Sequence, residues 1–152
     1  MNMIFGILTD AFFISLLIWC ACTDIRARTV PNTAIILLLF LGLAHTVLIG
    51  LSSSAWWPYP AGLVWAIPFF IVWLKGSIGA GDVKLLMGIG LYLGLAATLI
   101  SFALMLPMLI ACMIHFLRKH GTLRHAIPFA PVLAFGAGTA VIAGYLYPFI
   151  LL

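Results

Sequence analysis

The chain consists of long apolar stretches that short polar segments interrupt, which is the pattern of helices that cross a membrane. A helix needs about 20 apolar residues to span the hydrocarbon core of a bilayer. Stretches near this length run over residues 4–23, 33–51, 59–74 and 127–149. We predict a spanning helix in each of them.

The apolar stretch at residues 83–117 is too long for a single span. It carries one charge, Lys84, and a continuous helix over it would measure roughly 50 Å against about 30 Å of hydrocarbon. We therefore predict a break near residues 94–98, which separates a short fourth span from a fifth. The chain then has six transmembrane helices, with 127–149 as the sixth.

Composition supports an all-α polytopic membrane protein with one domain over residues 1–152. Hydrophobic residues make up 66% of the chain, charged residues 7%, and the mean hydropathy is +1.31. A soluble domain carries about 25% charged residues. This balance excludes a soluble globular protein, a disordered chain, a coiled coil and a secreted disulfide scaffold.

The basic residues predict the orientation of the helices. All seven lie in or beside the connections between spans one and two, three and four, or five and six: Arg26, Arg28, Lys75, Lys84, Arg118, Lys119 and Arg124. Basic loops face the cytoplasm, so we expect both termini outside. Lys84 and Arg118 share a side only if an even number of spans separates them, which supports the break.

The acids are few: Asp10, Asp24 and Asp82, with no Glu. Asp24 ends the first span and Asp82 begins the fourth, so the topology brings both to one level on the cytoplasmic side. Two close carboxylates share a proton, so one can act as general base on water while the other donates to a scissile carbonyl. This pattern indicates an aspartic protease.

Structural roles remain open for the same acids. Asp24 and Asp82 could each cap a helix or pair with a neighbouring Arg or Lys. Asp10 lies near the outer end of the first span, where we expect it to cap the helix together with Thr9.

The histidines and cysteines predict no metal site. His45, His115, His120 and His125 have no metal-ligand spacing, and Cys20, Cys22 and Cys112 form no CxxC pair.

Three motifs surround these acids. Asp24 opens D-I-R-A-R-T-V-P-N, which ends in Pro31-Asn32, and Asp82 closes G-A-G-D and continues V-K-L-L. Residues 127–136 read I-P-F-A-P-V-L-A-F-G. In this order and over nearly the whole chain, they resemble the type IV prepilin peptidase family of GxGD aspartic proteases.

The resemblance implies that Asp24 and Asp82 are the catalytic pair. Gly79 and Gly81 are expected to allow backbone conformations closed to other residues and a close approach of the substrate backbone. Lys84 could tune the charge of Asp82 or reach lipid phosphates.

Prolines and an amide mark two predicted helix starts. Pro31 and Asn32 begin the second span, where Pro suits the first turn and Asn the cap. Pro128 and Pro131 open the sixth span and could shape its entry into the site.

Members of this family remove the short basic leader of prepilins or pseudopilins, which precedes a hydrophobic helix, on the cytoplasmic side after a Gly. The resemblance therefore implies a multi-pass protein of the bacterial inner membrane, in contact with lipids, without nucleic acid and without a cofactor. The chain is similar to the short peptidase-only members that serve tight-adherence (Flp) pili, so we expect no methyltransferase domain.

Two other functions remain open. The first is a GxGD protease for other membrane substrates, as presenilin-like enzymes are, which the chain resembles only at the GxGD. The second is a small transporter that uses Asp24 and Asp82 as a proton or cation site. Transport predicts polar groups across the bilayer, whereas apart from Asp10 the acids gather on one side.

Overall fold

The protein is described here by a computed structural model, which covers residues 3–52, 56–76, 78–120 and 128–150. These residues form helices and contain no strand, so the predicted all-α class is confirmed. In chain order the helices are α1 (Met3–Ala27), α2 (Asn32–Ser52), α3 (Pro58–Ala61), the 3₁₀ helix η1 (Gly62–Trp65), α4 (Ala66–Leu74), α5 (Ala80–His120) and α6 (Ala130–Ile150).

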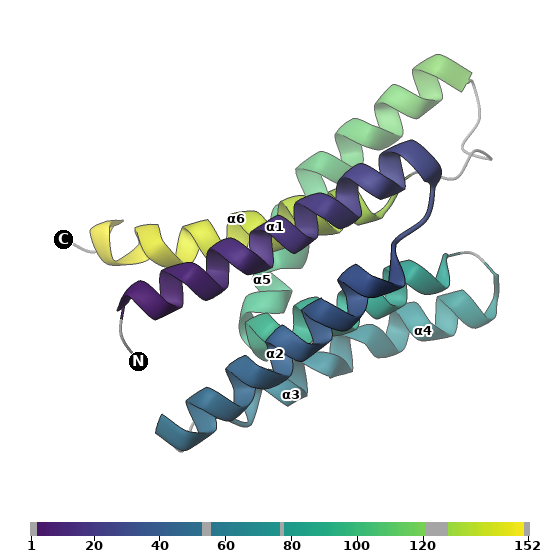
Figure 1. Ribbon diagram of the computed structural model, residues 1–152. Coiled ribbons are helices and arrows are strands. Elements are labelled where there is room, and N and C mark those ends of the chain that lie inside the picture. The colour runs from purple at the N-terminus through teal and green to yellow at the C-terminus, as the bar shows by residue number, and fades with distance from the viewer. Residues whose placement is uncertain (1–2, 53–55, 77, 121–127, 151–152) are drawn as a thin grey trace.

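The break predicted between residues 94 and 98 is found at Gly94. Its φ of 81° and ψ of −179° are not helical, and a Cβ there would lie 3.2 Å from the carbonyl oxygen of Pro58. Glycine alone adopts such a backbone without strain. In Figure 1 the chain turns back at this point, so both ends of α5 lie toward the same end of the molecule.

The stretch predicted as one helix over residues 59–74 is a composite of α3, η1 and α4. Its centre lies directly against α5, because a Cβ on Gly62 would come within 2.0 Å of the carbonyl oxygen of Gly90. Paired glycines of this kind let two helix backbones touch. The contact positions the first half of α5, which carries Asp82.

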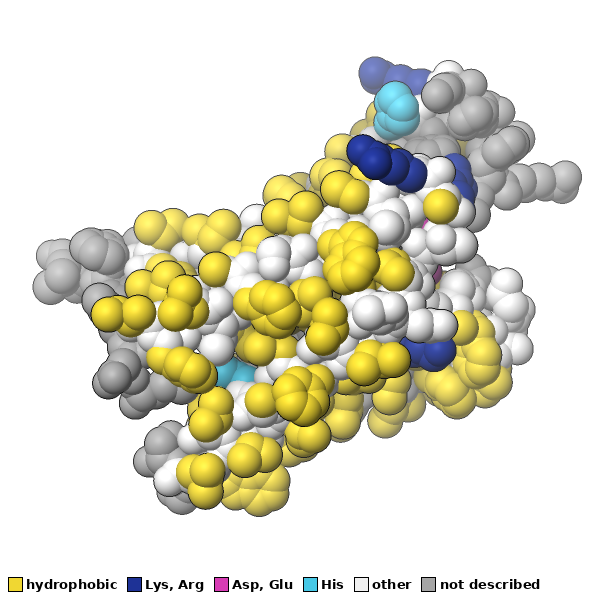
Figure 2. Space-filling model, viewed as in Figure 1, with side chains coloured by type: hydrophobic (Ala, Val, Ile, Leu, Met, Phe, Trp, Pro, Cys, Tyr) yellow, Lys and Arg dark blue, Asp and Glu magenta, His cyan; other side chains and the backbone are white. Residues whose placement is uncertain are grey.

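Buried side chains gather where α1, α2, α5 and α6 meet. Phe13, Leu38, Leu85 and Leu133 are almost fully buried there. The flanks, in contrast, are covered with apolar side chains, and Lys and Arg gather toward one end (Figure 2). By length and composition α1, α2 and α5 are each apolar enough to cross a membrane. These features fit a membrane protein.

The helix ends sort into two groups. The first turns of α1 and the last turns of α6 lie at one end of the molecule (Figure 1). The α1–α2 connection and the beginning of α5 lie at the other, and the candidate site is formed there.

Candidate active site

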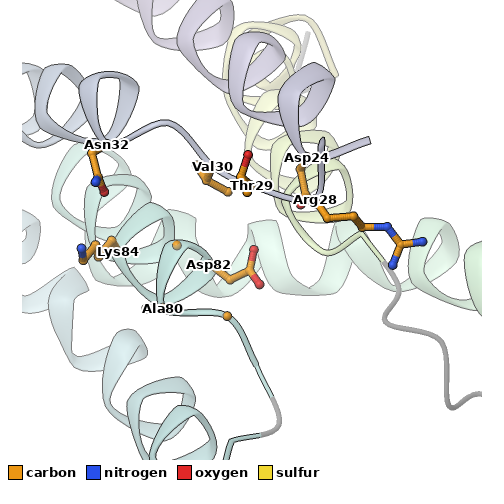
Figure 3. A pocket seen from close by; sticks show the side chains of 10 residues that line it. Asp24, Arg28, Thr29, Val30, Asn32, Ala80, Asp82 and Lys84 are labelled. Carbon is orange, nitrogen blue, oxygen red and sulfur yellow. The ribbon is translucent and has the colours of Figure 1, made fainter. Parts of the chain in front are cut away.

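A pocket of about 310 Å³ opens at the end of the bundle where α1 ends and α5 begins. Asp24 and Asp82 both line it, together with residues of the α1–α2 connection (Figure 3). The two acids that the sequence placed at one level are therefore brought into one cavity. Asn32, Gly79, Gly81 and Lys84, which the sequence also singled out, line the same pocket.

Asp24 is buried, with 7% of its surface exposed, and it is fixed by a helix other than its own. Its Oδ2 accepts a hydrogen bond of 3.1 Å from the backbone N–H of Ala130, the first residue of α6. First-turn N–H groups have no partner within their own helix, and a carboxylate is a favourable acceptor for them. Asp24 thus contacts the start of α6 through one of its two oxygens, which is the capping alternative applied to a helix distant in sequence.

Asp82 is half-buried in the first turn of α5. Its backbone N–H donates to the carbonyl oxygen of Gly79 at 3.2 Å, which fixes the turn at the start of the helix. Its side chain extends toward the end of α1 that carries Asp24 (Figure 3).

The two glycines of the GxGD segment have a steric role rather than a conformational one. The described glycines with positive φ lie elsewhere, so the backbone freedom expected of Gly79 and Gly81 is not used. A Cβ on Gly81 would lie 3.1 Å from the Cβ of Val30, and one on Gly79 would lie 3.3 Å from Oδ2 of Asp82. The glycines therefore leave room for the α1–α2 connection and for the Asp82 carboxylate.

Arg28 turns the chain out of α1 and into the pocket wall. It has a φ of 54°, in the left-handed region, and its N–H donates to the carbonyl oxygen of Asp24 at 2.9 Å. A left-handed residue directly after the last helical residue is a common helix terminator, usually filled by Gly. Arginine gives no sequence signal for it, so this turn could not be predicted.

The supporting residues differ in part from the predictions. The cap of α2 is Pro31, whose carbonyl oxygen accepts the N–H of Ile35 at 3.2 Å; Asn32 is the first helical residue and lines the pocket instead. Lys84 is exposed and extends away from Asp82 (Figure 3). Pro128 is half-buried two residues before α6, in keeping with a role in helix initiation.

Asp10 does not cap α1, and this prediction was wrong. The helix begins at Met3, and the Thr9 hydroxyl donates to the Gly6 carbonyl oxygen of the same helix. Asp10 instead accepts hydrogen bonds from the hydroxyls of Tyr92 and Tyr145. The sequence gives no sign of these partners, because they lie on α5 and α6.

The described part of the chain contains no group of three or more His, Cys, Asp and Glu placed to hold a metal ion. His45 stacks on Tyr92 with ring centroids 4.6 Å apart, and His115 is exposed on α5. His125 and the side chain of His120 lie outside the described residues.

The fold and the pocket define a class of protein. It is an all-helical protein with helices apolar enough to cross a membrane and two aspartates gathered in a pocket at one end. The sequence profile of the type IV leader peptidase family matches residues 11–117, which include both aspartates. The chain belongs to this family, which confirms the resemblance read from the motifs.

A bacterial relative extends the comparison. The chain is similar to the prepilin leader peptidase/N-methyltransferase of Bacillus subtilis (strain 168), with 34% identity over 156 aligned positions. The alignment covers 94% of this chain and 58% of the relative, so the chain spans little more than half of that protein. No solved structure matches the chain.

Proposed function

We propose that the chain is a membrane-embedded aspartic endopeptidase that removes the short basic leader of type IV prepilins or pseudopilins. The observation that carries this proposal is the meeting of Asp24 and Asp82 in one pocket, although they lie on different helices. Membership of a leader peptidase family supports the reaction type.

The proposed mechanism gives the two carboxylates different roles. Oδ2 of Asp24 accepts the N–H of Ala130, which leaves Oδ1 to take a proton from water. We therefore assign the general base to Asp24 and the general acid to Asp82. The water oxygen attacks the scissile carbonyl carbon, its proton passes to Asp24, and Asp82 protonates the carbonyl oxygen.

The tetrahedral intermediate then collapses. The C–N bond breaks, and the amine leaves with the proton that Asp24 took from water, while the hydroxyl proton returns to Asp82. The products are the leader with a new carboxyl group and the pilin with a new amino group. Water supplies every atom added, so the cycle restores both carboxyl groups.

The pocket's surroundings suit a substrate with a polar leader before an apolar helix. An apolar groove of about 220 Å³ adjoins the pocket, because Ala80 and Lys84 line both. Phe70, Trp73 and Met87 form much of its wall. We place the start of the substrate's hydrophobic helix in this groove and the leader in the pocket.

In the proposed orientation six helices cross the bacterial inner membrane. Both termini then lie outside, and the Asp24–Asp82 pocket faces the cytoplasm, where Lys and Arg are retained. The substrate helix lies beside the bundle in the bilayer, with its leader at the cytoplasmic surface.

Cleavage of defined substrates tests the proposal. The purified protein in liposomes is incubated with a prepilin peptide, with a single-span peptide lacking a leader, or with an imposed proton or cation gradient, and products are identified by mass spectrometry. We expect a cut only in the prepilin, between leader and hydrophobic helix. Cleavage of both peptides would favour a broader membrane protease, and ion flux without cleavage would favour a transporter.

A further inference from the structure

A second polar cluster lies toward the end of the bundle opposite the Asp24–Asp82 pocket. It surrounds Asp10, which lies on α1 roughly 20 Å from Asp24 along the helix axis. We propose that this cluster binds a primary ammonium group, such as the ethanolamine headgroup of a phospholipid. The proposal is independent of the peptidase reaction.

The Asp10 carboxylate is held in place but only partly satisfied. The Tyr92 hydroxyl donates to Oδ1 at 2.6 Å, and the Tyr145 hydroxyl donates to Oδ2. An ionised carboxylate has about four acceptor positions, so about two remain for a ligand. The tyrosines fix the carboxylate and leave it able to bind a donor.

Among the described residues, Asp10 is bonded to tyrosine hydroxyls and to no Lys or Arg. The Lys and Arg side chains visible in Figure 2 gather at the opposite end of the molecule, and the nearest basic residue along α1 is Arg26, about 24 Å away. An acid in a membrane helix is costly unless it is paired. A positively charged ligand would provide the missing partner.

A pocket of about 310 Å³ gives such a ligand room. Asp10, His45, Tyr59 and Tyr145 line it from four different helices. The Nδ1 atom of His45 is buried and has no hydrogen-bond partner among the described residues. Because solvent does not reach that atom, the Asp10 carboxylate supplies the acceptor positions for a ligand.

The aromatic rings favour a primary over a quaternary ammonium. Phe13 and His45 both stack on the Tyr92 ring, with centroids 4.1 and 4.6 Å away. Two rings cannot stack on the same face, so both faces of Tyr92 are covered. Tyr92 therefore offers no open face to a quaternary ammonium, and the free acceptor positions of Asp10 need N–H donors, which choline lacks.

The position of the pocket suits a lipid headgroup. Asp10 lies about 10 Å from the start of α1, and Tyr59, which lines the same pocket, follows Trp57 by two residues. Trp56 and Trp57, exposed directly before α3, are residues that favour this interface. Tyr145 is 45% exposed, so the cluster is open to the surrounding lipid.

Native mass spectrometry of the full chain tests the proposal with three phospholipids of equal acyl chains. We expect phosphatidylethanolamine to bind more tightly than phosphatidylcholine or phosphatidylglycerol. Asp10→Asn should weaken that binding about tenfold or more, since a charge-assisted hydrogen bond is lost. Ser15→Ala on the same helix, whose hydroxyl donates only to the Phe12 carbonyl oxygen, should bind as the wild type does.

A second variant, Tyr145→Phe, tests whether binding depends on the Asp10 charge or on the shape of the pocket. It keeps Asp10 and the ring but removes one competing donor, so phosphatidylethanolamine should bind at least as tightly. Displacement by free ethanolamine would show that a soluble amine also binds, and its failure to displace would assign the site to lipid. Equal binding of the three lipids, undiminished binding by Asp10→Asn, or a loss in Tyr145→Phe equal to that in Asp10→Asn would overturn the proposal.

Discussion

At the residue scale, the orientation of Asp24 depends on a backbone group 106 residues away in sequence. The acids themselves could be predicted, because an apolar chain with three aspartates offers few candidates and the topology puts two at one level. Their partners could not, since the N–H of Ala130 has no side-chain signature. The same holds for Tyr92 and Tyr145, which the sequence does not connect with Asp10.

Gly81 is predicted to set the spacing between α5 and the α1–α2 connection. Gly81→Ala puts a Cβ 3.1 Å from that of Val30, so we expect a loss of about 1 kcal/mol in stability and slower prepilin cleavage. Adding Val30→Gly, which removes that Cβ, should restore the cleavage rate. The measurements are melting temperature and cleavage rate. Gly138→Ala, whose Cβ meets open space, is the control, and a loss as large there would exclude the steric explanation.

At the scale of the elements, chain length and charge placement predicted the break in α5 because a continuous helix would exceed the bilayer and separate Lys84 from Arg118. The division of the third apolar stretch into α3, η1 and α4 could not be predicted in this way. It occurs where the backbones of Gly62 and Gly90 touch, and these two glycines are far apart in the sequence.

Gly94→Ala is expected to destabilise the fold by about 1–3 kcal/mol. The backbone there has a φ of 81° and a ψ of −179°, a region that glycine alone adopts readily, and the added methyl would meet the Pro58 carbonyl oxygen at 3.2 Å. Thermal unfolding in detergent measures the effect. Gly144→Ala, with nothing within 4 Å of its added Cβ, should cost far less. An unchanged melting temperature in Gly94→Ala would contradict the strained break.

At the scale of the whole molecule, the orientation in the membrane follows from the basic residues alone, and it stays a prediction. The expectation of a single peptidase domain without a methyltransferase also stays a prediction. The structure shows where residues useful for testing the orientation lie. Lys75 and Trp57 are both exposed, and they lie at opposite ends of the α3–η1–α4 segment.

Cysteine labelling in intact cells tests this orientation. Cys20, Cys22 and Cys112 are replaced by Ala, and a single cysteine is introduced as Trp57→Cys or Lys75→Cys. A membrane-impermeant maleimide should label position 57 directly and position 75 only after permeabilisation, because basic connections stay in the cytoplasm. The reverse pattern would invert the orientation and move the Asp24–Asp82 pocket to the outer face.

The most direct test of the central claim compares cleavage of a purified prepilin by the wild type, Asp24→Asn and Asp82→Asn in liposomes. Asparagine keeps the shape but cannot exchange the proton, so both variants should fold and lose about a thousandfold in rate. Thr23→Val, beside Asp24 and bonded only within α1, should cleave normally. Near-normal cleavage by either Asn variant would contradict the account, because that aspartate would then be structural.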